Sequence, residues 1–203
     1  MDIVILDTEY TTWEGALQRM WSGPNEEREL VQISGIRVSD FKTLNGTKFF
    51  SVFTKPCINP ELSDYFIDLT GIKQKDIEEN GIAIEEGIKR FSDFSKNSYC
   101  LCWGDDVRVL EKNLSLINSA INLGLARVAD IRNLFNVFGI ETSIYNSGTI
   151  SNFSDTESII QPGKNHNALS DCISILSAIN KLQSIHGSEC LNEAIINLPR
   201  YNP

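Results

Sequence analysis

The chain opens with "DIVILDTEY", a short apolar run that leads directly into two acidic residues. Four consecutive aliphatic residues, 3–6, are typical of a strand that is buried on both faces of a sheet. Side chains two positions apart on a strand point to the same face, so we expect Asp7 and Glu9 to project side by side from its end. Unpaired charges at such a place cost several kcal/mol. The sequence therefore predicts a counter-charge beside them, and a divalent metal ion is the first candidate.

The rest of the chain predicts a mixed sheet covered by helices. Strand signals come first at 3–7, 30–38 and 48–54, and the short turn-bearing connection before the third favours antiparallel pairing. Two later strand signals, at 99–103 and 127–130, alternate with segments in which apolar residues recur at helical spacing. Those helical segments are 84–94, 110–121, 131–138 and 167–185. This order predicts an α/β fold: a five-stranded mixed sheet, its first three strands antiparallel and the others parallel, with helices on both faces.

The length of 203 residues and the hydrophobic fraction of 41% indicate one globular domain. We expect this domain to cover residues 1–186 and a C-terminal tail to follow at 187–203, which could dock on the core or reach a partner. No apolar run approaches the roughly 20 residues of a membrane helix, and the N-terminus lacks the basic start and apolar segment of a signal peptide. We therefore predict a cytoplasmic protein with no membrane partner, whereas its oligomeric state does not follow from the sequence.

Charge and cysteine content narrow the kind of site that the chain can carry. The formal net charge of −9 argues against broad electrostatic adhesion to nucleic acid. It is compatible with an enzyme that meets phosphate through bound cations, because two divalent ions bring four positive charges to one place. Five cysteines without a C-x-x-C pair, together with only two histidines, disfavour a zinc site and indicate reduced, mostly buried thiols.

Two further acidic motifs stand at places that suit a site. In "WGDDVRVL", Asp105 and Asp106 follow the fourth strand, at the strand end where open α/β sheets place their ligands. A helix N-cap is the alternative role for either residue. In "HNALSD", His166 and Asp171 are five residues apart, which puts them about 140° apart on a regular helix. They converge only if His166 lies in the loop before the helix, with Asn167 as the N-cap.

These motifs, in this order and within a mixed α/β chain, resemble those of the DEDDh exonucleases of the DnaQ-like, RNase H-like superfamily. That family has an N-terminal D-x-E on its first strand, a mid-chain Asp and a late H-x-x-x-x-D, which read here as "LDTEYT", "WGDDVRVL" and "HNALSD". The chain is most similar to the KapD-like and Eri-type branch, through "ELVQISGIRV" and "PCINPELSDYFIDLTGIKQKDIE". The resemblance spans roughly residues 2–182 and implies the RNase H-like arrangement of the sheet.

The resemblance also implies a role for each matching residue. Asp7, Glu9 and Asp171 match metal ligands, and His166 matches the general base. Two Mg²⁺ or Mn²⁺ ions held by such carboxylates would clamp the scissile phosphate, one polarising the attacking water and the other stabilising the leaving 3′ oxygen. His166 would take the proton of that water. The implied activity is that of a 3′–5′ exonuclease, which releases nucleoside 5′-monophosphates from single-stranded DNA or RNA ends.

The middle ligand and the substrate contacts are less closely defined by the motifs. Asp106 matches the middle ligand when "DVRVL" is aligned with the family's D-x-x-x-L. The chain is one residue shorter before this motif, so Asp105 stays an alternative, and we favour Asp106. We also predict substrate contacts from Thr8, Tyr10 and Trp13, which stand within or just after the first motif.

The connection 11–29 should leave the sheet at the same end as Glu9. Its Trp21, Arg19 and Arg28 could stack on exposed bases or pair with phosphate. Equally, the tryptophans could fill the core and the arginines could be solvated, and the sequence favours neither.

Two other functions compete with the exonuclease. One is a non-catalytic nucleic-acid-binding module of the same fold, which the intact set of four acids and a histidine disfavours. The other is an RNase H-like endonuclease, which the late H-x-x-x-x-D disfavours.

Overall fold

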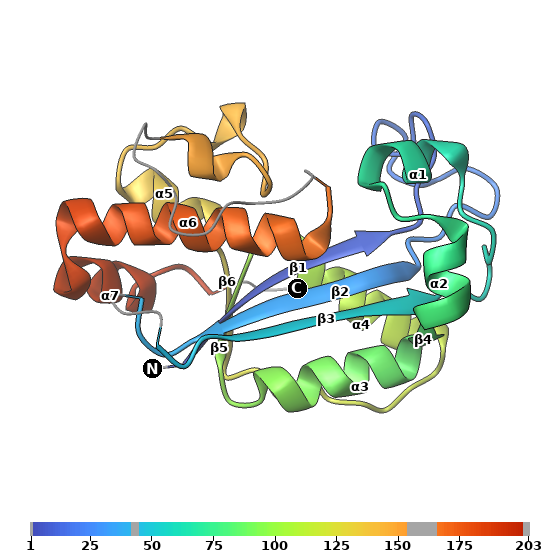
Figure 1. Ribbon diagram of the computed structural model, residues 1–203, viewed down its shortest axis with the longest axis horizontal. Coiled ribbons are helices and arrows are strands. Elements are labelled where there is room, and N and C mark those ends of the chain that lie inside the picture. Colours follow the sequence, from blue (N-terminus) through green and yellow to red (C-terminus); the bar gives the residue numbers. More distant parts are fainter. Residues whose placement is uncertain (1, 42–44, 154–165, 201–203) are drawn as a thin grey trace.

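The computed structural model describes residues 2–41, 45–153 and 166–200. A six-stranded sheet in the order β4-β3-β2-β1-β5-β6 forms its centre (Figure 1). The strands are β1 (Ile3–Tyr10), β2 (Leu30–Val38), β3 (Lys48–Lys55), β4 (Ile82–Ala83), β5 (Tyr99–Cys102) and β6 (Arg127–Asp130). β1 pairs antiparallel with β2 and β2 with β3, whereas β5 runs parallel to β1 and β6 parallel to β5. The predicted mixed sheet is confirmed, and the short β4 adds a sixth strand parallel to β3.

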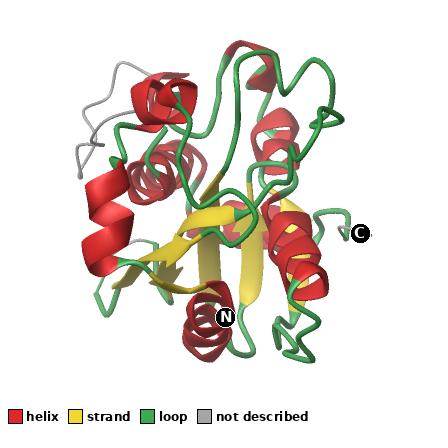
Figure 2. Ribbon diagram, turned by 90° about the vertical axis from the view of Figure 1, so that its right-hand side faces the viewer, coloured by secondary structure: helices red, strands yellow, loops and turns green. Residues whose placement is uncertain are grey.

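Helices lie on both sides of this sheet (Figure 2). They are α1 (Asp64–Thr70), α2 (Gln74–Asn80), α3 (Ile84–Ser95), α4 (Asp106–Leu116), α5 (Arg132–Val137), α6 (Ala168–His186) and α7 (Ser188–Ile196), with 3-10 turns η1 (Thr142–Ile144) and η2 (Ile150–Phe153). One apolar cluster joins the sheet to α5, α6 and α7, and a second joins its other face to α3 and α4. A smaller cluster holds α1 and α2 against β2 and β3.

Strand β1 separates the two large clusters, and its alternation decides where the acidic side chains point. Ile3 and Ile5 belong to the cluster on the α6 face, while the residues that alternate with them belong to the cluster on the α3–α4 face. All four aliphatic side chains are buried, as the continuous apolar run predicts. Asp7 and Glu9 continue the odd-numbered series toward α6, and Thr8 continues the even-numbered series toward α4.

Two element boundaries differ from the expected ones. β1 extends to Tyr10, because its pairing with β2 continues past the acidic residues, so these lie within the strand and not beyond it. Helix α4 ends at Leu116, although the apolar stripe continues to Ile121. Ile121 still packs against the same cluster, but from the connection that follows the helix. A periodic stripe therefore marked the buried face correctly and the helix end wrongly.

The segment expected as a C-terminal tail packs on the core. Leu191 and Ile195 of α7 are buried in the α6-face cluster. The polar composition of 146–165 predicts mostly loop, with Ser154 and Glu157 as possible caps of a short helix. The structure describes this stretch as far as residue 153, where it contains η2, and both capping residues lie outside the described residues. All five cysteines are free, three of them buried and two exposed. Within the described ranges, no helix combines the length and apolarity needed to cross a membrane.

Candidate metal centre

Three carboxylates from two elements converge beside the end of β1. Asp7 and Glu9 project from the strand toward α6, and Asp171 lies in the first turn of that helix. One carboxylate oxygen from each comes within 4.8 Å of the other two. Helix α6 lies across the face of the sheet next to β1, which is how a residue from the end of the chain reaches two from its beginning (Figure 1).

His166 stands directly before α6, in the loop position that the five-residue spacing requires for convergence. Its backbone is left-handed, with φ of 57°, a conformation that few residues other than glycine adopt. Asn167 is the N-cap, and its side-chain oxygen accepts a hydrogen bond from Ser170 N at 3.4 Å. Ala168 N donates to Gln32 Oε1 at 3.1 Å, which ties the helix start to β2. His166 is thereby held on the same cleft as the three carboxylates.

The structure separates the two candidates for the middle acid. Asp106, the first residue of α4, is 8% exposed and lines the cleft, whereas Asp105 before it is exposed to solvent. The backbone N–H and the hydroxyl of Thr8 both donate to Asp106 Oδ1, at 3.0 and 2.7 Å. Thr8 was expected to contact substrate, but its hydroxyl and its N–H are used to orient Asp106. β1 therefore positions acidic groups on both of its faces.

Ser147 belongs to the site, although no motif or periodicity in the sequence marks it. It precedes η2, lines the cleft and donates its hydroxyl to Asp171 Oδ2 at 2.7 Å. The other oxygen, Asp171 Oδ1, is buried and has no hydrogen-bond partner among the described residues. One oxygen of this carboxylate is thus fixed in place, and the other is left for a ligand.

Burial opposes the ionisation of all four carboxylates. Desolvation is the largest cause that raises the pKa of Asp7 and of Glu9 well above their ordinary values, and neighbouring carboxylates raise both further. Desolvation also raises the pKa of Asp171. Burial raises the pKa of Asp106 to about 7, although the hydrogen bonds from Thr8 lower it. Without a counter-charge, burial and mutual repulsion therefore favour the protonated forms of these acids.

The donor set fits a hard divalent cation. The converging atoms are all carboxylate oxygens, the ligands that Mg²⁺ and Mn²⁺ prefer. A bound cation would offset the repulsion among the acids and would satisfy the unpartnered Oδ1 of Asp171. Ser147 would orient Asp171 and Thr8 would orient Asp106 through their hydrogen bonds, as the hydrogen-bond partners of metal ligands commonly do.

The carboxylates open into a cleft of about 420 Å³. Aromatic and apolar residues supply most of its other lining: Tyr10, Trp13, Leu17, Trp21, Tyr65, Leu69 and Trp103. Tyr10 and Trp13 were expected to contact substrate, and both face this space. Tyr65 and Leu69 were not anticipated, although their four-residue spacing puts them on one face of α1. Desolvation raises the pKa of Tyr10 to about 12, so that its hydroxyl stays protonated.

The two arginines of the connection 11–29 have different surroundings. Arg19 forms an ion pair with Glu26 of the same connection, at the surface. The guanidinium of Arg28 lies over the rings of Tyr10 and Trp21, 5.7 and 5.3 Å from their centroids. Arg28 therefore supports the aromatic lining of the cleft.

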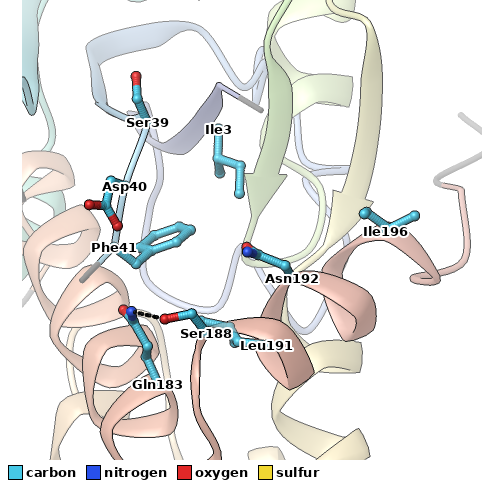
Figure 3. Close-up of a pocket in the computed structure, with 9 residues that line it drawn as sticks. All are labelled: Ile3, Ser39, Asp40, Phe41, Gln183, Ser188, Leu191, Asn192 and Ile196. Carbon is cyan, nitrogen blue, oxygen red and sulfur yellow. Dashed lines mark hydrogen bonds between the residues drawn. The ribbon is translucent and has the colours of Figure 1, made fainter. Parts of the chain in front are cut away.

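A second hollow has a volume of about 200 Å³ and shares no lining residue with the carboxylate cleft (Figure 3). It is bounded by Ile3 at the start of β1, by residues 39–41 and by α7. Gln183 Nε2 donates to Ser188 Oγ across its floor at 2.8 Å. Asp40 is the one acidic residue of its described lining, so no carboxylates gather there. The cleft at the carboxyl ends of β1 and β5 is therefore the candidate site.

Comparisons with known proteins agree with this geometry. The sequence matches the model of a family described as Exonuclease (RNase_T) over residues 4–178. Among curated proteins, none matches the chain. The nuclease domain of 3′hExo, a DEDDh family member solved bound to rAMP, is 19% identical with a TM-score of 0.75, and the alignment covers 99% of this chain and 96% of that chain.

Two further solved structures share the fold. Cell-death related nuclease 4 (CRN-4) is 17% identical with a TM-score of 0.70, over 91% of this chain and 64% of that chain. Exonuclease X, solved with 5′ overhanging duplex DNA, is 16% identical with a TM-score of 0.60, over 95% of this chain and 99% of that chain.

Proposed function

This chain belongs to the exonuclease family whose model matches residues 4–178, and from that premise we propose that it is a divalent-metal-dependent 3′–5′ exonuclease. Its products would be nucleoside 5′-monophosphates, and its substrates single-stranded ends of DNA or RNA. The resemblance to DEDDh exonucleases is confirmed at the family level, while the KapD-like and Eri-type branch stays a prediction. The observation that carries the proposal is the convergence of Asp7, Glu9 and Asp171 in one cleft with His166.

The four carboxylates would hold the cofactor, two Mg²⁺ or Mn²⁺ ions. Asp7, Glu9 and Asp171 are close enough to share an ion, and Asp106 lines the same cleft from the start of α4. When bound, two such ions supply positive charge to the scissile phosphate and to the attacking and leaving oxygens. The ionised form of each acid is then the working form, because a carboxylate must lose its proton to bind a metal.

His166 is the general base of this proposal. It is half-buried at the edge of the cleft, directly before the helix that carries Asp171. An imidazole at that place can accept a proton from a water molecule in the cleft and pass it to solvent. Tyr10 is unsuited to this task, because burial keeps its hydroxyl protonated.

The substrate contacts come from the lining of the same cleft. Tyr10 and Trp13 present aromatic surface to the 3′-terminal nucleotide, and Thr8 acts through Asp106. The solved relative 3′hExo holds rAMP, which is a nucleoside monophosphate of the kind proposed as product. We expect the protein to act in the cytoplasm, where its five free thiols stay reduced.

Digestion of 3′- and 5′-labelled DNA and RNA oligonucleotides with Mn²⁺ tests the proposal. We expect mononucleotides to be released from the 3′ end only, and a blocked 3′ end to stop the reaction. Asp7→Asn should abolish release with folding intact, whereas Asp105→Asn, a matched change on an exposed acid, should retain it. Internal cuts in the blocked oligonucleotide would favour an endonuclease, and binding without any cleavage would favour a non-catalytic module.

A further inference from the structure

Gln32 on β2 is a buried polar residue to which the proposed reaction gives no role. It is 3% exposed and lies directly opposite Glu9 in the antiparallel pairing of β1 with β2. Residues opposite each other in such a pair project to the same face of the sheet, so Gln32 faces α6 next to a predicted metal ligand. A buried polar side chain costs free energy unless its hydrogen bonds are made. The partners of Gln32 therefore indicate its role.

Both ends of the Gln32 amide have partners in the protein. The amide oxygen accepts a hydrogen bond from Ala168 N at 3.1 Å, and the amide nitrogen donates to Ser51 Oγ at 3.1 Å. Ser51 Oγ in turn lies 2.9 Å from Ser34 Oγ. Because a backbone N–H can only donate, the amide oxygen must be the end that faces Ala168. The hydroxyl of Ser51 on β3 fixes the other end, so the side chain is held in one orientation.

Ala168 is the first residue of α6, where a helix leaves its N–H groups without partners inside the helix. The N-cap Asn167 accepts from Ser170 N, two residues further along. Ala168 is fully buried, so its N–H needs an acceptor within the protein, and Gln32 supplies one. This hydrogen bond is therefore a polar link between the first residue of α6 and the sheet.

The start of α6 carries the site residues that come from the end of the chain. His166 stands two residues before Ala168, and Asp171 stands three residues after it. A shift of the helix start would change the distance of both from Asp7 and Glu9 on β1. Misplacement by about 1 Å can cost a reaction about 100-fold in rate. Apolar packing is not directional, whereas a hydrogen bond requires a defined distance and angle, so the link to Gln32 can fix the position of the helix start.

We propose that Gln32 is a positioning residue of the metal centre, which sets the α6 residues at the distance from β1 that cation binding requires. The inference rests on the proposed exonuclease function, and Gln32 acts in it through Ala168. Loss of the oxygen acceptor should weaken cation binding and lower kcat. KM for an oligonucleotide should change little, because Gln32 is not among the residues that line the cleft.

Two variants of Gln32 separate the oxygen acceptor from the length of the side chain. Gln32→Met keeps an unbranched chain but has no oxygen for Ala168 N, whereas Gln32→Glu keeps an oxygen acceptor. The Kd for Mn²⁺ is measured by electron paramagnetic resonance of the free ion, and kcat and KM are measured on a 3′-labelled oligonucleotide. Gln32→Met should raise the Kd for Mn²⁺ and lower kcat, each about 10- to 100-fold. Gln32→Glu should keep the Kd at or below the wild-type value and should rescue kcat.

Thr54→Val is the matched control for the loss of a buried hydrogen bond. Thr54 on β3 is fully buried and donates its hydroxyl to Leu30 O at 2.6 Å. Its methyl group faces Gly87 of α3, on the other side of the sheet from α6. Valine has nearly the same shape, so this variant should lose stability and keep the wild-type Kd and kcat. An equal rise in Kd in Thr54→Val would assign the effect to lowered stability and would overturn the inference.

Hydrogen exchange of the wild-type protein in EDTA tests the contact itself, whether or not Gln32→Met folds. The first N–H groups of a helix usually exchange freely, because they have no partner within it. The N–H of Ala168 should instead be protected like that of Asp171, which donates to Asn167 O. Free exchange at Ala168, or a folded Gln32→Met variant with the wild-type Kd and kcat, would overturn the inference and leave the exonuclease proposal standing. A wild-type protein that binds Mn²⁺ but releases no nucleotide would refute the proposed function, and the Kd values and the exchange of Ala168 would then decide the inference alone.

Discussion

Replacing Asp106 by Asn tests whether the acidic cluster is destabilising until a cation binds. Asn keeps the side-chain oxygen that accepts both hydrogen bonds from Thr8, and it removes only the capacity to ionise. Burial raises the pKa of Asp106 from an ordinary value of about 3.9 to about 7. The folded metal-free protein therefore holds this proton more tightly than the unfolded chain does. Protonation of Asp106 therefore stabilises the folded protein fully below about pH 4, and this stabilisation is lost as the pH rises toward 7.

The size of this effect on the free energy of unfolding follows from the difference between the pKa of Asp106 in the folded protein and its ordinary value. Each pKa unit corresponds to about 1.4 kcal/mol, so ionising Asp106 in the metal-free protein costs about 4 kcal/mol above pH 7. The free energy of unfolding of Asp106→Asn should equal that of the wild type near pH 4. As the pH rises, the free energy of unfolding of the variant should exceed that of the wild type by about 1.4 kcal/mol more for each pH unit. This difference should become constant above pH 7.

Urea unfolding in EDTA, at several pH values from 4 to 8.5, measures this difference. Asp105→Asn is the matched control, because it changes an exposed acid one residue earlier and should stay within about 0.5 kcal/mol of the wild type throughout. Saturating Mn²⁺ should reduce or reverse the advantage of Asp106→Asn, since a cation stabilises the protein that binds it more tightly. A difference that does not change with pH, or that Mn²⁺ leaves unaltered, would refute the electrostatic account of the cluster.

Other contacts give further expectations. Ser147→Ala removes the hydrogen bond that favours the ionised form of Asp171, so the pKa of that carboxyl should rise further. The acidic limb of the kcat/KM profile against pH, measured with Mn²⁺, should therefore move to higher pH. An acidic limb at the wild-type pH would contradict this role of Ser147. Glu29 is buried, and its carboxylate accepts hydrogen bonds from the backbone N–H groups of residues 57–59. Glu29→Ala should lower the free energy of unfolding by about 2–3 kcal/mol in urea titrations, while Glu61→Ala, on an exposed side chain, should have no such effect.

The sequence predicted most of the sheet because its strands have strong local signals. The apolar run 3–6 and the β-rich segment 30–38 are each buried, and the register between β1 and β2 follows from that burial. The two-residue β4 has no pattern of its own, because it exists only through pairing with the end of β3. The helix α7 was taken for a tail, since its two buried residues, Leu191 and Ile195, find their partners only in the folded core.

The candidate site was predictable where spacing carried the information. Residues two apart on a strand share a face, which placed Asp7 beside Glu9, and the five-residue spacing in "HNALSD" required His166 to precede the helix. The choice between Asp105 and Asp106 needed the rotation of α4, which depends on packing. Ser147 lies in a polar loop, and only the tertiary fold brings it to Asp171.

Anomalous diffraction from crystals grown with saturating Mn²⁺ tests the central claim most directly, because it locates the cation among the carboxylates. The account predicts at least one Mn²⁺ ion bonded to oxygens of Asp7, Glu9 and Asp171, the three groups that lie within 4.8 Å of one another. Manganese bound elsewhere, with these three carboxylates free of metal, would contradict it.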